Sequence, residues 1–191
     1  MLHLNGQSKV ASFFTLSSPE KCWVIFHPFK AKKAFEITNN TLKRTDSLKM
    51  NSVLIDSNGG QLDAFKHSFW MASLSQRIGK KASEKLGVAH ENGNYKNFKK
   101  KQFEDGFLPD QKSSEMDLFN NNIGVKIGEE NKELNQRKIM ILLINQIQNG
   151  DMRILKKDSL GNFLSCEGKI ILQDSFQAKW ENEKCLIPSN Q

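Results

Sequence analysis

The sequence lacks most of the patterns that identify common classes of small proteins. Its three cysteines are too few for a disulfide scaffold and form no CxxC metal pair. No apolar run is long enough to cross a bilayer, and residues 1–22 lack the continuous hydrophobic segment of a secretory signal. The GxSxG and P-loop patterns are also absent. The helical HExxH pattern is absent as well, because Asn94 stands where the second histidine would follow His90. These absences exclude the hydrolase and nucleotide-binding classes that such motifs define.

Basic residues exceed acidic ones, with 28 Lys and Arg against 21 Asp and Glu, a net charge of +7 and a pI near 9.3. Such a surface favours encounters with phosphates, anionic lipids or acidic partners. The lysines gather only at 30–33 and 96–101, without the interleaved aromatic residues of a stacking platform, so a solvated basic face explains them as well. We expect a monomer without a transmembrane segment and with a weak bias towards anionic partners.

The length suits one compact domain, and the patterns predict a mainly α-helical fold of about five helices with a small C-terminal β-hairpin. We expect a flexible N-terminal segment over residues 1–20, a helical core domain over 21–150 and a β-hairpin tail over 151–191 packed on the same domain. The expected helices span residues 27–48, 60–79, 80–91, 113–130 and 131–150.

Turn and capping residues set the expected ends of these helices. Pro28 is favourable at the first position of the first helix, and Gly150 is expected to end the last one. Ser113 or Ser114 is expected as the N-cap of the fourth helix. The Asn-Gly-Asn sequence at 92–94 predicts a turn, followed over 95–112 by a long connection of the kind that is often a functional lid.

The C-terminal region is expected to form the hairpin over 152–172, around a DSLGN turn. Cys166 and Cys185 flank this strand region and would staple it in an oxidising compartment, leaving Cys22 unpaired. In a reducing compartment all three would be buried thiols.

The helix expected over 60–79 is apolar on more than one side, yet Asp63 and His67 stand four residues apart within it. At 100° per residue, one face carries Phe65, Phe69 and Ala72, and the opposite face carries Asp63, His67, Trp70 and Leu74. This pattern predicts a central helix that is buried on most sides.

A second polar stripe occurs in the helix expected over 113–130, where Asp117, Asn121, Gly124 and Gly128 share one face. Two glycines on a stripe permit another helix to approach closely, so the polar pair is expected in a packed interface. Together with the neighbouring helices, the candidate polar residues are Asp63, His67, His90, Glu91, Asp117 and Asn121.

Three interpretations of these residues remain open from spacing alone. Imidazole and carboxylate groups are the ligands of Zn²⁺ and similar divalent ions, and a carboxylate that fixes a histidine tautomer is also the arrangement of a general base. The same residues can instead hold helices in register as a buried hydrogen-bond network, with no chemistry. A ligand-binding site is the third interpretation.

Three ordered motifs, DAFKH at 63–67, AHE at 89–91 and MDLFNN at 116–121, resemble an uncharacterised bacterial domain family. The pattern of that family is DAF(R/K)H, then AHE, then MDLxNN, and this chain resembles the Bacteroidetes-type members over about residues 20–190. The resemblance implies that the polar motif positions are Asp63, His67, His90, Glu91, Asp117, Asn120 and Asn121.

The family resemblance implies a bacterial surface or secreted protein, or a module of larger toxin-like chains, and gives the Cys166–Cys185 bridge more weight. The cell envelope or export is therefore favoured, although the chain as given shows no signal peptide. The alternatives to an enzyme are a noncatalytic helical binding or structural module and a secreted antibacterial toxin-like effector.

Our leading hypothesis is a metal-assisted hydrolase with a polar site between helices. Its expected metal ligands are Asp63, His67, His90 and Asp117, with a divalent ion as the possible cofactor. The expected catalytic residues are His67, His90 and Glu91, and Asn120 and Asn121 are expected to support the site. A phosphodiester, a lipid or an envelope polymer is the expected substrate.

Overall fold

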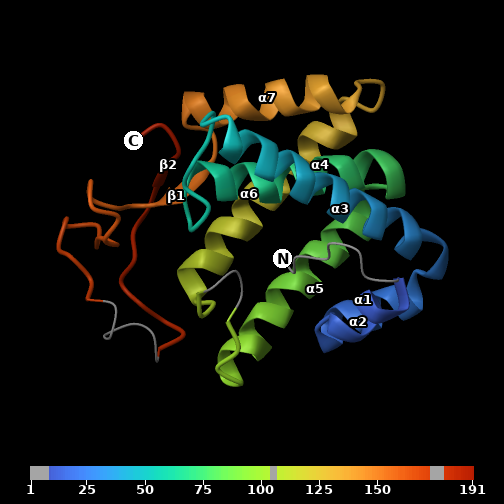
Figure 1. Cartoon of the computed structure of the whole chain (residues 1–191), viewed down its shortest axis with the longest axis horizontal. Coiled ribbons are helices and arrows are strands. Elements are labelled where there is room, and N and C mark those ends of the chain that lie inside the picture. The colour runs from blue at the N-terminus through green and yellow to red at the C-terminus, as the bar shows by residue number, and fades with distance from the viewer. Residues whose placement is uncertain (1–8, 104–106, 173–178) are drawn as a thin grey trace.

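The computed structural model of the chain describes residues 9–103, 107–172 and 179–191, and within them the fold is mainly helical (Figure 1). The mainly helical class and the small C-terminal β element are thus confirmed, but the described residues contain seven helices rather than five. The elements are α1 (Lys9–Thr15), α2 (Ser18–Phe26), α3 (Pro28–Met50), α4 (Gln61–Ile78), α5 (Lys80–Lys99), α6 (Gln111–Glu130), α7 (Gln136–Asn149), β1 (Arg153–Leu155) and β2 (Leu186–Pro188).

Helix α4 lies at the centre of the fold, and 13 of its 18 residues are buried. One side packs Phe65, Phe69 and Ala72 against α7 and its surroundings, in a cluster that includes Ile139, Leu143 and Ile147. The other side packs Trp70, Met71 and Leu74 in a second cluster with Trp23 of α2 and Leu86 of α5. The prediction of a central helix buried on most sides is confirmed, because both of its apolar faces have partners.

Helices α4 and α6 cross at very short range. A Cβ atom at Gly124 would overlap the backbone carbonyl oxygen of Ser68, and one at Gly128 would overlap that of Ala72. Only glycine fits where two helix backbones touch in this way. The expected close approach is confirmed, and it brings the stripe that carries Asp117 against α4.

The two additional helices, α1 and α2, lie near the N-terminus, where we had expected a flexible segment over 1–20. Residues 1–8 of that segment lie outside the described residues. Helix α2 begins with a capping box: the Ser17 side chain accepts from the backbone N–H of Glu20, and the Glu20 carboxylate accepts from the N–H of Ser17. The capping box is visible in the sequence as Ser17-x-x-Glu20, and it marks a helix that the prediction of about five helices left out.

Helix α5 continues to Lys99, so the turn predicted at 92–94 is wrong, and residues 95–99 of the predicted connection are helical. The physical reason is packing against α2. A Cβ atom at Gly93 would overlap the Ser17 side chain, so Gly93 lets the start of α2 lie against α5. Tertiary contact here outweighs the turn preference of Asn and Gly.

Two other helix starts also differ from the sequence prediction. Asp110, rather than Ser113 or Ser114, caps α6 by accepting from the N–H of Ser113 at 3.0 Å. Helix α7 begins at Gln136, capped by Asn135, instead of at 131. At its other end Gly150 adopts the left-handed conformation (φ 85°), which confirms the predicted stop.

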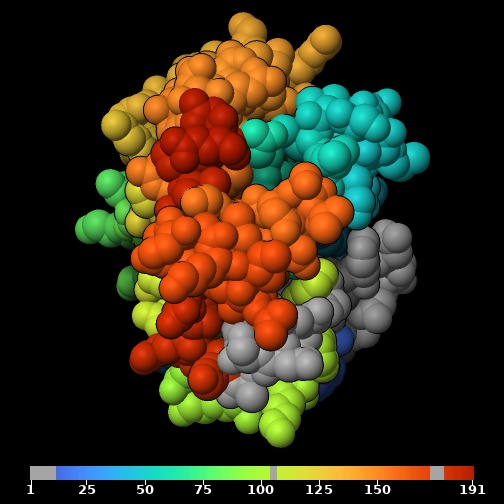
Figure 2. Space-filling model, turned by 90° about the vertical axis from the view of Figure 1, so that its left-hand side faces the viewer, coloured from blue at the N-terminus to red at the C-terminus, as the bar shows by residue number. Residues whose placement is uncertain are grey.

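The C-terminal region forms an antiparallel pair in which Arg153 lies opposite Pro188 and Leu155 opposite Leu186. The DSLGN turn is present, and a bridge between Lys157 and Phe163 flanks it, but the named strands pair across the longer excursion between residues 155 and 186. Figure 2 shows this region, orange to red, spread over one face of the helices. Within the described ranges, no helix combines the length and apolar character that a bilayer crossing requires.

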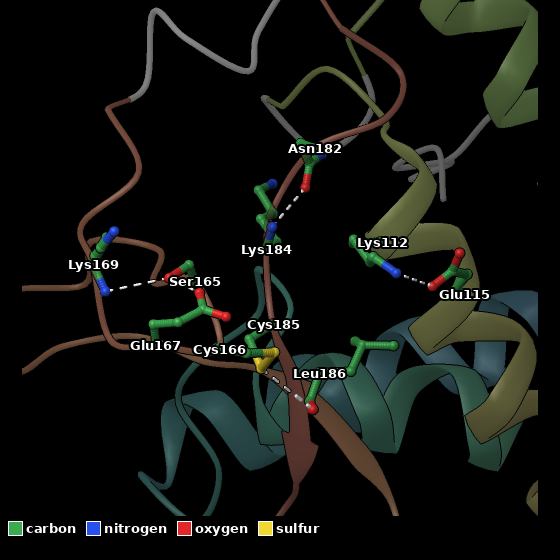
Figure 3. Close-up of a disulfide and its surroundings, with 10 residues drawn as sticks. All are labelled: Lys112, Glu115, Ser165, Cys166, Glu167, Lys169, Asn182, Lys184, Cys185 and Leu186. Atoms are coloured by element: carbon green, nitrogen blue, oxygen red, sulfur yellow. Dashed lines mark hydrogen bonds and ion pairs between the residues drawn. A yellow bond between two sulfur atoms is a disulfide. The ribbon is translucent and has the colours of Figure 1, made fainter.

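A disulfide between Cys166 and Cys185 closes this excursion, whereas Cys22 is free and exposed. Figure 3 shows the bond where the chain enters β2, with Lys184 immediately before it. The buried Lys184 ammonium lies 2.6 Å from the carboxylate of Asp110, the residue that caps α6. The C-terminal region is thereby bonded to the start of the helix that carries Asp117.

Candidate functional site

Asp63, His67 and Asp117 form a cluster between α4 and α6 in which one ligand atom from each lies within 4.8 Å of the others. Within the described part of the chain, this is the one group of three or more His, Cys, Asp or Glu residues that could hold a metal ion. Nε2 of His67 is 3.4 Å from Oδ1 of Asp117 and 3.7 Å from Oδ1 of Asp63. Both carboxylates therefore face the same imidazole nitrogen.

The local structure explains why Asp63 and His67 meet. They are one helical turn apart, so their side chains lie on the same face of α4. Asp63 stands in the first turn of α4, where the helix dipole favours a negative charge, and its Oδ2 accepts from the N–H of Gly59 at 2.9 Å. Lys66 lies 2.9 Å from its Oδ1, so this carboxylate is held in place from two sides.

His90 lies beside this cluster rather than in it. Its ring centroid is 6.0 Å from that of His67, and the Trp70 ring packs edge-on against it at 5.5 Å. Nδ1 of His90 donates to Oε1 of Glu20 at 3.0 Å. Burial alone would raise the pKa of Glu20. The hydrogen bond and charge of His90 and the hydrogen bonds of Ser17 together lower it by more, so the pKa of Glu20 is below its ordinary value.

The remaining predicted residues lie on the same helices with different contacts. Glu91 is buried on α5 and accepts from the side-chain amide of Asn94 at 3.2 Å. Asn120 is fully buried and bonds both backbone groups of Arg153 at 2.9 Å, which ties β1 to α6. Asn121 is buried too, and its amide nitrogen lies close to Gly87 of α5.

A small pocket of about 60 Å³ opens onto the cluster. Asp63, His67 and Asp117 line it together with His90 and Asn94 of α5. Its other wall comes from the connection before α6, including Phe107, Leu108 and Pro109. The pocket is large enough for one or two small molecules the size of water, so the cluster is reachable by a small polar ligand.

Two site residues were missed in the sequence, Glu20 and Lys66. Glu20 carried a signal, because Ser17-x-x-Glu20 is a capping box, but the sequence does not reveal its pairing with His90 across 70 positions. Lys66 stood inside the DAFKH motif, and its spacing of three from Asp63 predicts an ion pair on one helix face.

By its fold and its site, the protein is a mainly helical domain with a cluster of carboxylate and imidazole groups where two helices cross. Residues 21–151 match the family described as a domain of unknown function (DUF6973), and the chain belongs to this family. The match begins within α2, covers α3 to α7 in full and includes every predicted site residue, and it confirms membership of an uncharacterised domain family. No curated protein and no solved structure matches the chain.

Proposed function

We propose that this protein is a metal-assisted hydrolase in which Asp63, His67 and Asp117 hold a divalent cation. The observation that carries the proposal is that three ligand atoms from two helices lie within 4.8 Å of one another beside a pocket. Two ligands about 2.1 Å from a tetrahedral ion lie roughly 3.4 Å apart, and Nε2 of His67 is 3.4 Å from Oδ1 of Asp117.

The donor set fits such an ion. One imidazole and two carboxylates suit Zn²⁺ or Mn²⁺ and leave positions for water or substrate. The Gly59 N–H and Lys66 hold the Asp63 carboxylate in orientation, as the outer partners of metal ligands do. A bound divalent ion would polarise the substrate and lower the pKa of a bound water.

In this proposal His90 transfers protons at the edge of the site. Glu20 accepts from Nδ1, which fixes the tautomer and orientation of the ring and stabilises its protonated form. Imidazole is suited to this task because its ordinary pKa lies near neutrality. Glu91, one residue further along α5, is the second candidate acid or base.

The setting of the site bears on its substrate and compartment. The disulfide between Cys166 and Cys185 fits an oxidising compartment, which supports export to the cell envelope or beyond. The net charge of +7 favours anionic substrates such as phosphodiesters and phospholipids.

The rival function is a noncatalytic module in which the same residues form a structural network. One observation favours it: the Lys66 ammonium already lies 2.9 Å from Asp63 and supplies a positive charge there. In that case the cluster would stabilise the crossing of α4 and α6 without a metal.

Metal content of the full chain, measured by elemental mass spectrometry, tests the proposal. We expect one equivalent of a divalent metal, lost in His67→Ala and in Asp117→Asn and retained in Asp46→Asn, a matched change at an exposed position on α3. Protein that is metal-free and takes up no Zn²⁺, Mn²⁺, Mg²⁺ or Ca²⁺ on titration would leave the structural network as the function of the cluster.

A further inference from the structure

A second and much larger cavity, of about 1030 Å³, shares His90 in its lining with the small pocket beside Asp63, His67 and Asp117. Helices α1, α2, α3 and α5 line it, with Trp70 of α4 also reaching it. In Figure 1, α1 and α2 lie at the lower right, with α3 above them and α5 beside them. His90 and Asn94 line both this cavity and the small pocket, so the two spaces meet at the proposed acid–base residue.

The wall of the cavity combines an aromatic and aliphatic part with many polar and charged side chains. Trp23, Trp70 and Leu86 form part of it from α2, α4 and α5, and Phe13, Val24 and Phe35 contribute from α1, α2 and α3. Cavities of this size are typical of small-molecule sites. The aromatic and aliphatic side chains offer a surface for a hydrocarbon chain, and the serine, threonine, asparagine and lysine side chains of the same lining offer hydrogen-bonding groups for a polar headgroup.

The charges around the cavity have one dominant sign. Its lining includes five lysines, from α2, α3, the end of α5 and the segment after it: Lys21, Lys32, Lys96, Lys100 and Lys101. Among the lining residues that the structure describes, Glu20 is the one carboxylate, and His90 already bonds it. Lys21 and Lys96 bond groups of α1 and α2, and Lys32, Lys96, Lys100 and Lys101 are exposed. Several ammonium groups beside an aromatic and aliphatic surface complement an anionic headgroup attached to a hydrocarbon chain.

We propose that this cavity binds an amphiphile with one acyl chain and an anionic headgroup. If the protein is the hydrolase proposed above, this amphiphile is its class of substrate, because the cavity places the ligand next to His90.

Tryptophan fluorescence of the full chain in EDTA tests the binding step, because Trp23 and Trp70 lie in the cavity wall. The probes are lysophosphatidylglycerol, lysophosphatidylcholine of the same chain length, and glycerol 3-phosphate, all below micelle-forming concentrations. We expect saturable binding of lysophosphatidylglycerol, binding of lysophosphatidylcholine that is about tenfold weaker, and none of glycerol 3-phosphate.

Two variants assign the binding to this cavity. Ala31→Trp places a large ring in the lining and should abolish binding of both lysolipids. Lys32→Glu with Lys100→Glu should weaken binding of lysophosphatidylglycerol about fivefold to tenfold and leave lysophosphatidylcholine unchanged. The matched pair Lys126→Glu and Lys138→Glu, exposed on α6 and α7, has the same net charge and should bind like the unchanged protein.

Three results would overturn the proposal: no saturable binding of lysophosphatidylglycerol, equal binding of glycerol 3-phosphate, or lysolipid binding that Ala31→Trp does not alter. Since the titration is done without metal, the Asp117→Asn variant should bind the lysolipid normally. Lipid binding by a protein that takes up no metal would refute the hydrolase alone, and a metal-loaded protein that binds no lysolipid would refute the cavity proposal alone.

Discussion

Glu20 of α2 and His90 of α5 form a largely buried hydrogen bond, 3.0 Å long, between residues 70 positions apart, and His90 lines both cavities. The Glu20 side chain is 16% exposed and that of His90 is 9% exposed, so water screens their interaction only weakly. The same carboxylate closes the capping box of α2 through the N–H of Ser17. One side chain therefore both starts a helix and orients the proposed acid–base residue.

The first prediction concerns Glu20→Gln, which keeps the shape of the side chain and removes its charge. Because the pKa of Glu20 in the folded protein is below its ordinary value of 4.5, the ionised carboxylate stabilises the fold. This contribution is complete above pH 4.5 and is lost as the pH falls through the lower folded pKa. We expect the variant to be about 1–2 kcal/mol less stable at neutral pH.

Urea unfolding at pH 7 and at several values below pH 4.5 checks this prediction. The difference in unfolding free energy between the unchanged protein and Glu20→Gln should become smaller as the pH is lowered. Glu84→Gln on α5 is the matched control, because the Glu84 side chain is 40% exposed and its ion pair with Lys80 is long, at 3.9 Å; it should change little at either pH. A difference that is constant with pH would mean that the Glu20 charge does not stabilise the fold.

The second prediction is that a divalent metal stabilises the fold through Asp117. A ligand that binds the folded state alone, at 100 times its Kd, adds about 2.7 kcal/mol, which in a chain of this size raises Tm by roughly 5–10 °C. Differential scanning calorimetry with and without Zn²⁺ or Mn²⁺ should show this increase. Asp117→Asn should lose it, and Asp46→Asn should keep it.

The stability of Asp117→Asn without metal separates the two functions of the cluster. A metal site brings two carboxylates near one imidazole, so removing one negative charge should be tolerated or even favourable in the apoprotein. In a purely structural network the same change should destabilise the fold at every metal concentration. Unfolding of the apoprotein in EDTA therefore gives opposite expectations for the two functions.

The three central residues of the candidate site could be predicted from local patterns in the sequence, whereas the residues around them could not. Asp63 and His67 are one turn apart on a helix whose two apolar faces are plain in the sequence, and Gly124 and Gly128 marked the close crossing that adds Asp117. All of these signals lie within single helices. They required no knowledge of the tertiary structure.

Other features depend on contacts that the sequence does not encode locally. The turn signal at 92–94 was overridden because Gly93 packs against Ser17, and Glu20 reaches His90 only after α2 packs on α5. Likewise, Asp110 caps α6 while it is paired with Lys184, 74 positions later. The pairing of β1 with β2 needs the whole C-terminal excursion to fold back.

The third prediction compares two glycine substitutions in helices. Gly124→Ala places a methyl group against the Ser68 backbone carbonyl of α4, which cannot move without shifting the helix. We expect a loss of about 2–4 kcal/mol, with the helix propensity of alanine offsetting at most about 1 kcal/mol. Urea unfolding measures the difference.

Gly87→Ala is the matched control for that crossing. Its new methyl group would lie 3.0 Å from the Cε of Met71, the flexible end of a side chain that can move aside. This variant should be nearly neutral. Equal losses in both variants would show that the α4–α6 crossing adapts as readily as a methionine side chain.

The fourth prediction concerns the disulfide between Cys166 and Cys185, which are 19 positions apart. Closing a loop of this size stabilises the folded state by roughly 3 kcal/mol in the chain-entropy picture. The bond also holds Lys184 next to Asp110, although burial lowers the pKa of Lys184 and the Asp110 charge only partly offsets this. Without the cross-link, the cost of burying that ammonium makes release of the C-terminal region easier.

We therefore expect Cys166→Ser with Cys185→Ser to lower the unfolding free energy by about 2–4 kcal/mol, and a reducing agent to do the same in the unchanged protein. Hydrogen exchange should show the loss first at the start of α6, where Asp110 caps the helix. Cys22→Ser is the control, because that thiol is free and exposed. If exchange at the start of α6 is unaffected when the disulfide is removed, the Lys184–Asp110 pair alone holds the C-terminal region against the helix that carries Asp117.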